Sequence, residues 1–111
     1  MEIRQSEVQS TVILSLVGRL DGLTSPDFDM QIKQLIAQNK HVLILDFAQL
    51  DYISSAGLRV LLMLQKQLKI LGGKSMLVNL KPDITHLFNI SGFSGIFNFS
   101  SSIEDALASI D

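Results

Sequence analysis

Hydrophobic and polar residues follow one another along this chain in blocks that predict both strands and helices. Five runs rich in aliphatic and β-branched residues predict strands at residues 2–8, 11–17, 41–47, 74–80 and 96–99. Residues 2–8 alternate only loosely, which suits an edge strand. Residues 41–47 are almost all apolar, which is typical of a central strand that is buried on both faces.

Between these runs, apolar residues recur at intervals of three and four and predict helices. One helix is capped by Thr24 or Ser25, one covers about residues 55–71, a short one starts near Pro82, and the last is capped by a serine of 100–102. The two glycines at 72–73 stop the second helix, because glycine readily adopts the left-handed conformation of a helix end. The stretch 18–22 predicts the end of a strand and a turn.

The predicted elements follow the order β-β-α-β-α-β-α-β-α, which favours parallel strand pairs joined by helical crossovers. We therefore predict an α/β fold with a mixed, partly parallel sheet of about five strands flanked by about four helices. A length of 111 residues suits a single domain with one core, covering residues 1–111.

The composition narrows the function classes. Hydrophobic residues make up 47% and charged residues 18%, so the chain should fold, and a formal net charge of -2 supplies no broad basic field for nucleic acid. No cysteine is present, which excludes disulfides and thiolate chemistry. No apolar run is long enough for a membrane span, the polar start is unlike a signal segment, and no residue cluster has metal-ligand spacing. We expect a cytoplasmic protein without a cofactor.

The most informative stretch is Ser54-Ser55-Ala56-Gly57, between the central strand and the helix that follows. A serine here can cap the helix, because its hydroxyl accepts from a free backbone N–H of the first turn. A helix start also favours a phosphate group electrostatically, so a serine here can equally be a phosphorylation site. Gly57 costs helix stability, and the pattern leaves two reasons for it: close packing against a strand, or access for a partner.

Enzymatic interpretations find little support. Asp46 lies at the end of one predicted strand and Asp21 follows another, so both carboxylates could meet Ser55 at one edge of a parallel sheet, although turn or cap hydrogen bonding explains each alone. His41 is expected at the opposite edge, and the pattern does not position His86. The chain has no nucleophile elbow, phosphate loop or dinucleotide-binding motif. We therefore predict that it is not an enzyme.

The motifs together resemble the STAS domain family of anti-sigma factor antagonists. Residues 45–47 and 50–58 resemble the family's strand, loop and Asp-Ser-small-Gly-Leu signature, and Gly18-Arg19-Leu20-Asp21 resembles its Gly-x-Leu-Asp turn. The glycines at 72–73 and the segment 87–93 resemble two further family motifs in the same order. The resemblance covers essentially the whole chain.

The resemblance implies a partner switch. The unphosphorylated antagonist would bind an anti-sigma factor that is a serine kinase, phosphorylation would release it, and a phosphatase would restore binding. Ser55 aligns with the phosphoacceptor, and Ser54 stands where well-known members carry Asp, so Ser54 is an alternative acceptor. The implied partner surface comprises Asp21, Ser54, Ser55, Ala56 and Gly57. The competing interpretations are a STAS scaffold or subunit of a transport or signalling assembly without phosphoregulation, and a small nucleotide-binding protein.

Overall fold

A computed structural model describes residues 1–110, which form five strands and four helices. The strands are β1 (Glu2–Val8), β2 (Thr11–Leu20), β3 (Val42–Ile53), β4 (Lys74–Val78) and β5 (Phe99–Ser100). The helices are α1 (Ser25–Ala37), α2 (Ser55–Ile70), α3 (Pro82–Ile90) and α4 (Ile103–Ile110). The strands lie in sequence order in one sheet, with β1 antiparallel to β2 and all other pairs parallel. The predicted mixed sheet with flanking helices is confirmed.

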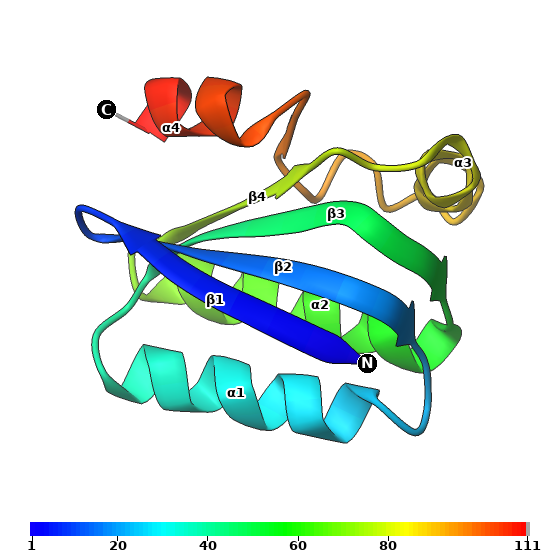
Figure 1. The fold of residues 1–111 in the computed structure, drawn as a ribbon, viewed down its shortest axis with the longest axis horizontal. Helices are drawn as coiled ribbons and strands as arrows, with labels where there is room; N and C mark the ends of the chain where they lie inside the picture. Colours follow the sequence, from blue (N-terminus) through cyan, green and yellow to red (C-terminus); the bar gives the residue numbers. More distant parts are fainter. Residues whose placement is uncertain (111) are drawn as a thin grey trace.

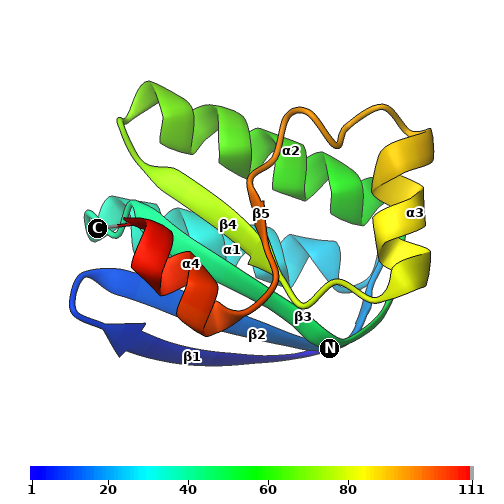
Figure 2. The same ribbon diagram turned by 90° about the horizontal axis from the view of Figure 1, so that it is seen from above.

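The helices occupy three positions around the sheet (Figures 1 and 2). Helices α1 and α2 cover one face, α4 covers the other, and α3 lies beside the end toward which β2 and β3 run. The larger core lies under α1 and α2 and includes Leu14 and Leu45, whereas the smaller core lies under α4 and includes Ile13 and Ile44. Successive strand residues thus point to opposite faces, which explains why the central strand is apolar throughout.

Strands β2 and β3 continue further than the pattern predicts. Between the pairs Ser15–Asp46 and Arg19–Tyr52, the register shifts twice, and each shift places an extra residue in β3. Such bulges interrupt the alternation of polar and apolar residues while the pairing continues. The predicted strand ends at residues 17 and 47 were therefore wrong, because β2 reaches Leu20 and β3 reaches Ile53.

The longer strands change the shape of the sheet edge. Strand β4 ends at Val78, which pairs with Asp46, so β2 and β3 project well beyond β4. The short strand expected at residues 96–99 is also displaced, since β5 contains only Phe99 and Ser100. The projecting ends of β2 and β3 carry the turn at Asp21 and the start of α2, which brings these two segments together.

The glycines at 72–73 end α2 as predicted. Gly72 has a φ of 75°, and the Gly73 N–H donates to the Leu68 carbonyl at 2.7 Å, which closes the last turn. A Cβ on Gly73 would lie 2.2 Å from the backbone oxygen of His41. His41 therefore lies beside the end of α2, away from its two N-terminal serines.

Candidate functional site at the start of helix α2

Ser54 is the N-cap of α2. Its Oγ accepts from the Gly57 N–H at 3.3 Å, and its own N–H donates to the Leu20 carbonyl at 2.9 Å. The side chain is half-buried, and the backbone is extended, with φ −97° and ψ 174°. Ser54 is thus engaged on both sides, by the helix that it starts and by the strand beside it.

Ser55 is the first residue of α2 and is exposed. Among the side-chain hydrogen bonds within residues 1–110, none involves the Ser55 hydroxyl, in contrast to the Ser54 hydroxyl. A group attached to this oxygen would project into solvent at the positive end of the helix dipole. The two neighbouring serines therefore differ in availability, which their sequence positions alone do not reveal. Ala56, next along the chain, is half-buried.

Gly57 is buried where α2 packs against the end of β2. A Cβ at this position would lie 2.8 Å from the Leu20 carbonyl oxygen and 2.8 Å from Leu20 Cγ. Both distances are far shorter than ordinary van der Waals contacts. Of the two reasons that the sequence leaves open for this glycine, the structure supports close packing against a strand.

Asp21 follows β2 directly and organises the turn into α1. Its Oδ1 accepts from the backbone N–H groups of Leu23, at 3.0 Å, and Thr24, at 3.2 Å, and Arg19 Nε lies 3.6 Å from Oδ2. Burial alone would raise the pKa of the Asp21 carboxyl, but the hydrogen bonds from Leu23 and Thr24 and the charge of Arg19 outweigh burial and hold the pKa below its ordinary value.

The Asp21 turn and the start of α2 are neighbours through the backbone. Leu20 pairs with Ile53 at the end of the parallel ladder, and the Ser54 N–H continues this pairing onto the Leu20 carbonyl. Thr24 does not cap α1 with its side chain; its hydroxyl donates to the Arg19 carbonyl at 2.8 Å and so closes the turn. The segments carrying Asp21 and Ser54 thus form one continuous surface.

Asp46 does not join this surface, and the expectation that it could was wrong. It lies within β3, opposite Ser15 on one side and Val78 on the other. Its carboxylate accepts from the Asn79 side-chain amide at 2.9 Å and from the Ala48 N–H at 3.0 Å. The bulged continuation of β3 to Ile53 separates it from Ser55.

A groove of about 400 Å³ adjoins the two serines on the side of α3. It is lined by the end of β3, the start of α2 and one face of α3: Asp51, Tyr52, Ile53, Ser54, Ser55, Leu58, Asp83, Ile84, His86, Leu87 and Ile90. Lys81, at the N-cap of α3, pairs with Asp51 at 2.6 Å and links the walls. His86, which the sequence pattern could not position, lines this groove and is exposed.

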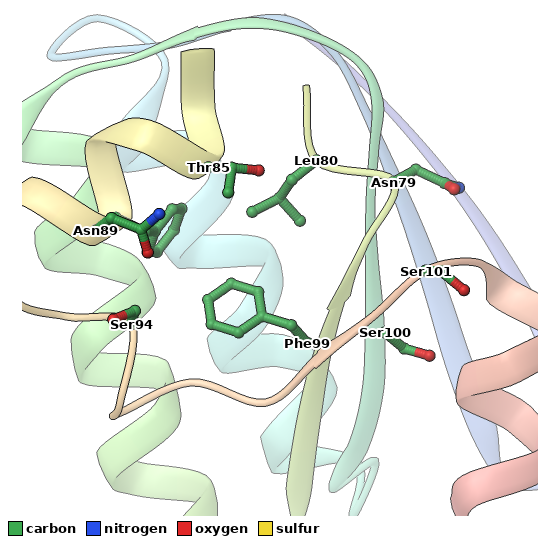
Figure 3. A pocket seen from close by; sticks show the side chains of 9 residues that line it. Asn79, Leu80, Thr85, Asn89, Ser94, Phe99, Ser100 and Ser101 are labelled. Atoms are coloured by element: carbon green, nitrogen blue, oxygen red, sulfur yellow. The ribbon is translucent and has the colours of Figure 1, made fainter. Parts of the chain in front are cut away.

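A second hollow of about 430 Å³ lies between α3 and the ends of β4 and β5 (Figure 3). Its nine lining residues are all uncharged: Asn79, Leu80, Thr85, Phe88, Asn89, Ser94, Phe99, Ser100 and Ser101. Figure 3 shows the Phe99 ring and the Leu80 side chain turned toward α3. The Phe99 and Phe88 rings meet edge to face, with centroids 5.6 Å apart. This hollow offers rings, hydroxyls and amides, but its lining supplies no cation for a phosphate.

The chain belongs to the STAS domain family, whose model matches residues 2–106. The resemblance predicted from the motifs is thereby confirmed. The chain is 34% identical to BtrV of Bordetella bronchiseptica, which is named as an anti-sigma factor antagonist, over 97% of this chain and 93% of that protein.

Solved structures agree on the fold. A Thermotoga maritima protein described as an anti-sigma factor antagonist superposes with a TM-score of 0.93 at 17% identity, covering 97% of this chain and 93% of the other. The phosphorylated form of the Bacillus protein SpoIIAA superposes with a TM-score of 0.76 at 23% identity, covering 99% of this chain and all 100% of that one. In residues 1–110, every helix is too short or too polar to cross a membrane.

Proposed function

We propose that this protein is an anti-sigma factor antagonist that works as a non-enzymatic partner switch. In this proposal, a serine-kinase-type anti-sigma factor binds the unphosphorylated chain and phosphorylates Ser55, the complex dissociates, and a serine phosphatase restores binding. The likeness to BtrV over nearly the whole of both chains supports this role. The observation that carries the proposal is that Ser55 is exposed and its hydroxyl forms no hydrogen bond within residues 1–110, whereas the neighbouring Ser54 hydroxyl caps the helix.

Ser55 is a better acceptor than Ser54 for a physical reason. A kinase must reach the hydroxyl oxygen and leave a phosphate on it. The Ser54 oxygen accepts from Gly57, so a phosphate there would have to be accommodated in the half-buried space where α2 meets β2. Ser55 is exposed, and in the part of the chain that the structure describes its hydroxyl has no hydrogen bond to lose. In the proposal, Ser54 acts as the N-cap of α2. Phosphorylation of Ser54 is the alternative, and it can be measured.

The partner surface that we propose combines the Asp21 turn with residues 54–57. Leu23, in the same turn, is 90% exposed and can supply an apolar contact to the partner. A phosphate would add about −1.5 to −2 charge to this surface. In the adjoining groove Asp51 is paired with Lys81, but Asp83 has no ion-pair partner within residues 1–110, so the added charge would enter a region with a net negative charge. A loss of about 3 kcal/mol in binding would weaken the complex roughly a hundredfold.

The first experiment locates the modification. The wild-type protein and the variants Ser55→Ala and Ser54→Ala are incubated with ATP and an extract of the native cells, and phosphate is located by mass spectrometry. We expect phosphate on the wild type and on Ser54→Ala, and none on Ser55→Ala. Equal phosphorylation of Ser55→Ala would contradict the assignment.

The second experiment tests the switch with the purified kinase that the first identifies. Calorimetric binding is compared for the wild type, Ser55→Ala and Ser55→Asp. We expect the first two to bind alike and Ser55→Asp to bind at least tenfold more weakly, since an aspartate carries less charge than a phosphate. Equal binding by all three would favour the competing interpretation, a STAS scaffold or transport subunit without phosphoregulation.

A further inference from the structure

We propose that Arg59 binds the phosphate group on Ser55 of the phosphorylated protein and stabilises the doubly charged form of that phosphate. This inference rests on the proposed function, because it concerns the phosphorylated form of the same serine. It assigns a task to a residue outside the Asp21 turn and the 54–57 segment. The inference is based on the position of Arg59, which forms no ion pair within residues 1–110 and lies one helical turn from Ser55.

Ser55 and Arg59 stand four residues apart within α2, and both are exposed. Residues at this spacing are neighbours on one side of a helix. Helical side chains lean toward the N-terminus of their helix, so the long side chain of Arg59 can reach back to the turn that carries Ser55. An acid that precedes a base by four residues is also the more favourable orientation of such a pair.

The guanidinium of Arg59 has no internal partner in the described part of the chain. The ion pairs among residues 1–110 use Arg4, Arg19, Lys33, Lys40 and Lys81. Arg19 is further engaged over the ring of Tyr52, 4.2 Å from its centroid. Arg59 is therefore a cation on α2 that a phosphate on Ser55 could recruit without breaking an existing pair.

The charges around Ser55 favour a phosphate position near Arg59 over a position in the groove. On the α3 side, the groove carries Asp51 and Asp83, and Lys81 is already paired with Asp51. His86 and Tyr52 are the other titratable residues that line the groove. The acids repel a phosphate from the groove, whereas Arg59 attracts it along the helix. A guanidinium can donate two parallel hydrogen bonds to phosphate oxygens, which would hold the group as a dianion at neutral pH.

The test titrates the phosphate itself. Protein is produced with phosphoserine incorporated at position 55 during translation, and ³¹P NMR follows the second ionisation, which for a phosphoserine lies near pH 6. We expect the substitution Arg59→Gln to raise this pKa by about 0.2–0.4 unit. Arg59→Lys should restore part of the shift. The matched control is Lys66→Gln, which removes an exposed cation two turns further along α2 and should leave the titration unchanged.

Identical titrations for the wild type and Arg59→Gln would overturn the inference, as would an equal effect of Lys66→Gln. Thermal melts of the unphosphorylated variants reveal any general loss of structure, which we do not expect at this exposed position. Because the phosphate is installed without a kinase, this result is independent of partner binding. The two proposals can fail separately. If Arg59→Gln shifts the titration but Ser55 is not phosphorylated in cell extract, the role of Arg59 is supported and the proposed function is rejected.

Discussion

Substituting Gly57 with alanine tests how closely α2 is seated on β2. The added methyl group would lie 2.8 Å from the carbonyl oxygen of Leu20 and 2.8 Å from its Cγ. Neither atom can yield easily. The oxygen accepts from the Ser54 N–H at 2.9 Å, and the Leu20 side chain is fully buried in the larger core. The start of the helix must therefore move away from the strand to admit the methyl group.

Two opposing terms set the magnitude. Forcing an extra methyl into a packed site costs about 1–3 kcal/mol, and contact with a hydrogen-bonded backbone oxygen places this case at about 2–3 kcal/mol. Alanine in place of glycine gains up to about 1 kcal/mol of helix propensity. The net expectation is a destabilisation of about 1–2 kcal/mol. In a domain of this size, that corresponds to a fall in Tm of about 4–8 °C.

Urea unfolding followed by circular dichroism measures this difference. Gly22→Ala is the matched control, because a Cβ on Gly22 meets no atom within 4 Å and its φ lies outside the left-handed region. The control should stay within about 0.5 kcal/mol of the wild type. If Gly57→Ala were as stable as the wild type, the packing argument would fail, and access for a partner would become the better reason for this glycine.

Two further substitutions test the site. Ser54→Ala removes the cap on α2 and should lower the free energy of unfolding in urea by about 1 kcal/mol. Ser54→Asp keeps an acceptor oxygen and should recover most of this loss. Equal losses in the two variants would show that the capping hydrogen bond is not the source of the stability. Asp21→Asn tests the lowered pKa of the turn. A carboxyl with a lowered folded-state pKa stabilises the fold above its unfolded-state pKa of about 3.9, and this contribution disappears as pH falls through the folded value. The variant should therefore have a lower Tm than the wild type at pH 7 and the same Tm near pH 2. A difference in Tm that persists at low pH would show that it does not come from the charge of Asp21.

The repeating apolar pattern was sufficient to predict the fold, because β2, β3, β4, α1 and α2 carry most of the buried residues, at the spacing of their own secondary structure. Where that pattern breaks, prediction failed. The bulges in β3 interrupt the alternation between Asp46 and Ile53 although hydrogen bonding continues. The sequence therefore made Asp46 look like a strand end. Its polar partners, Ser15 and Asn79, come from the two neighbouring strands or their ends, and such cross-strand partners are invisible to local pattern.

The position of the candidate site in the chain was predictable, but the pattern did not decide whether Ser54 or Ser55 caps the helix. Either Ser54 or Ser55 can cap a helix by composition, and only the position of the first turn decides which hydroxyl is used. His86 was beyond prediction for another reason. Its place on the groove depends on how α3 packs beside the projecting ends of β2 and β3, and the length of the connection from β4 does not specify that packing.

The contacts at the start of α2 converge on Leu20. Its carbonyl accepts from Ser54, the missing side chain of Gly57 leaves room for it, and its pairing with Ile53 ends the ladder. Tilting the helix would break these contacts together, so the surface that carries Ser55 is held rigidly against the sheet. A phosphate on Ser55 would meet no such constraint, because its oxygen faces solvent. A switch built on this serine therefore has to act through the charge that it adds to the surface, without a change in the shape of the fold.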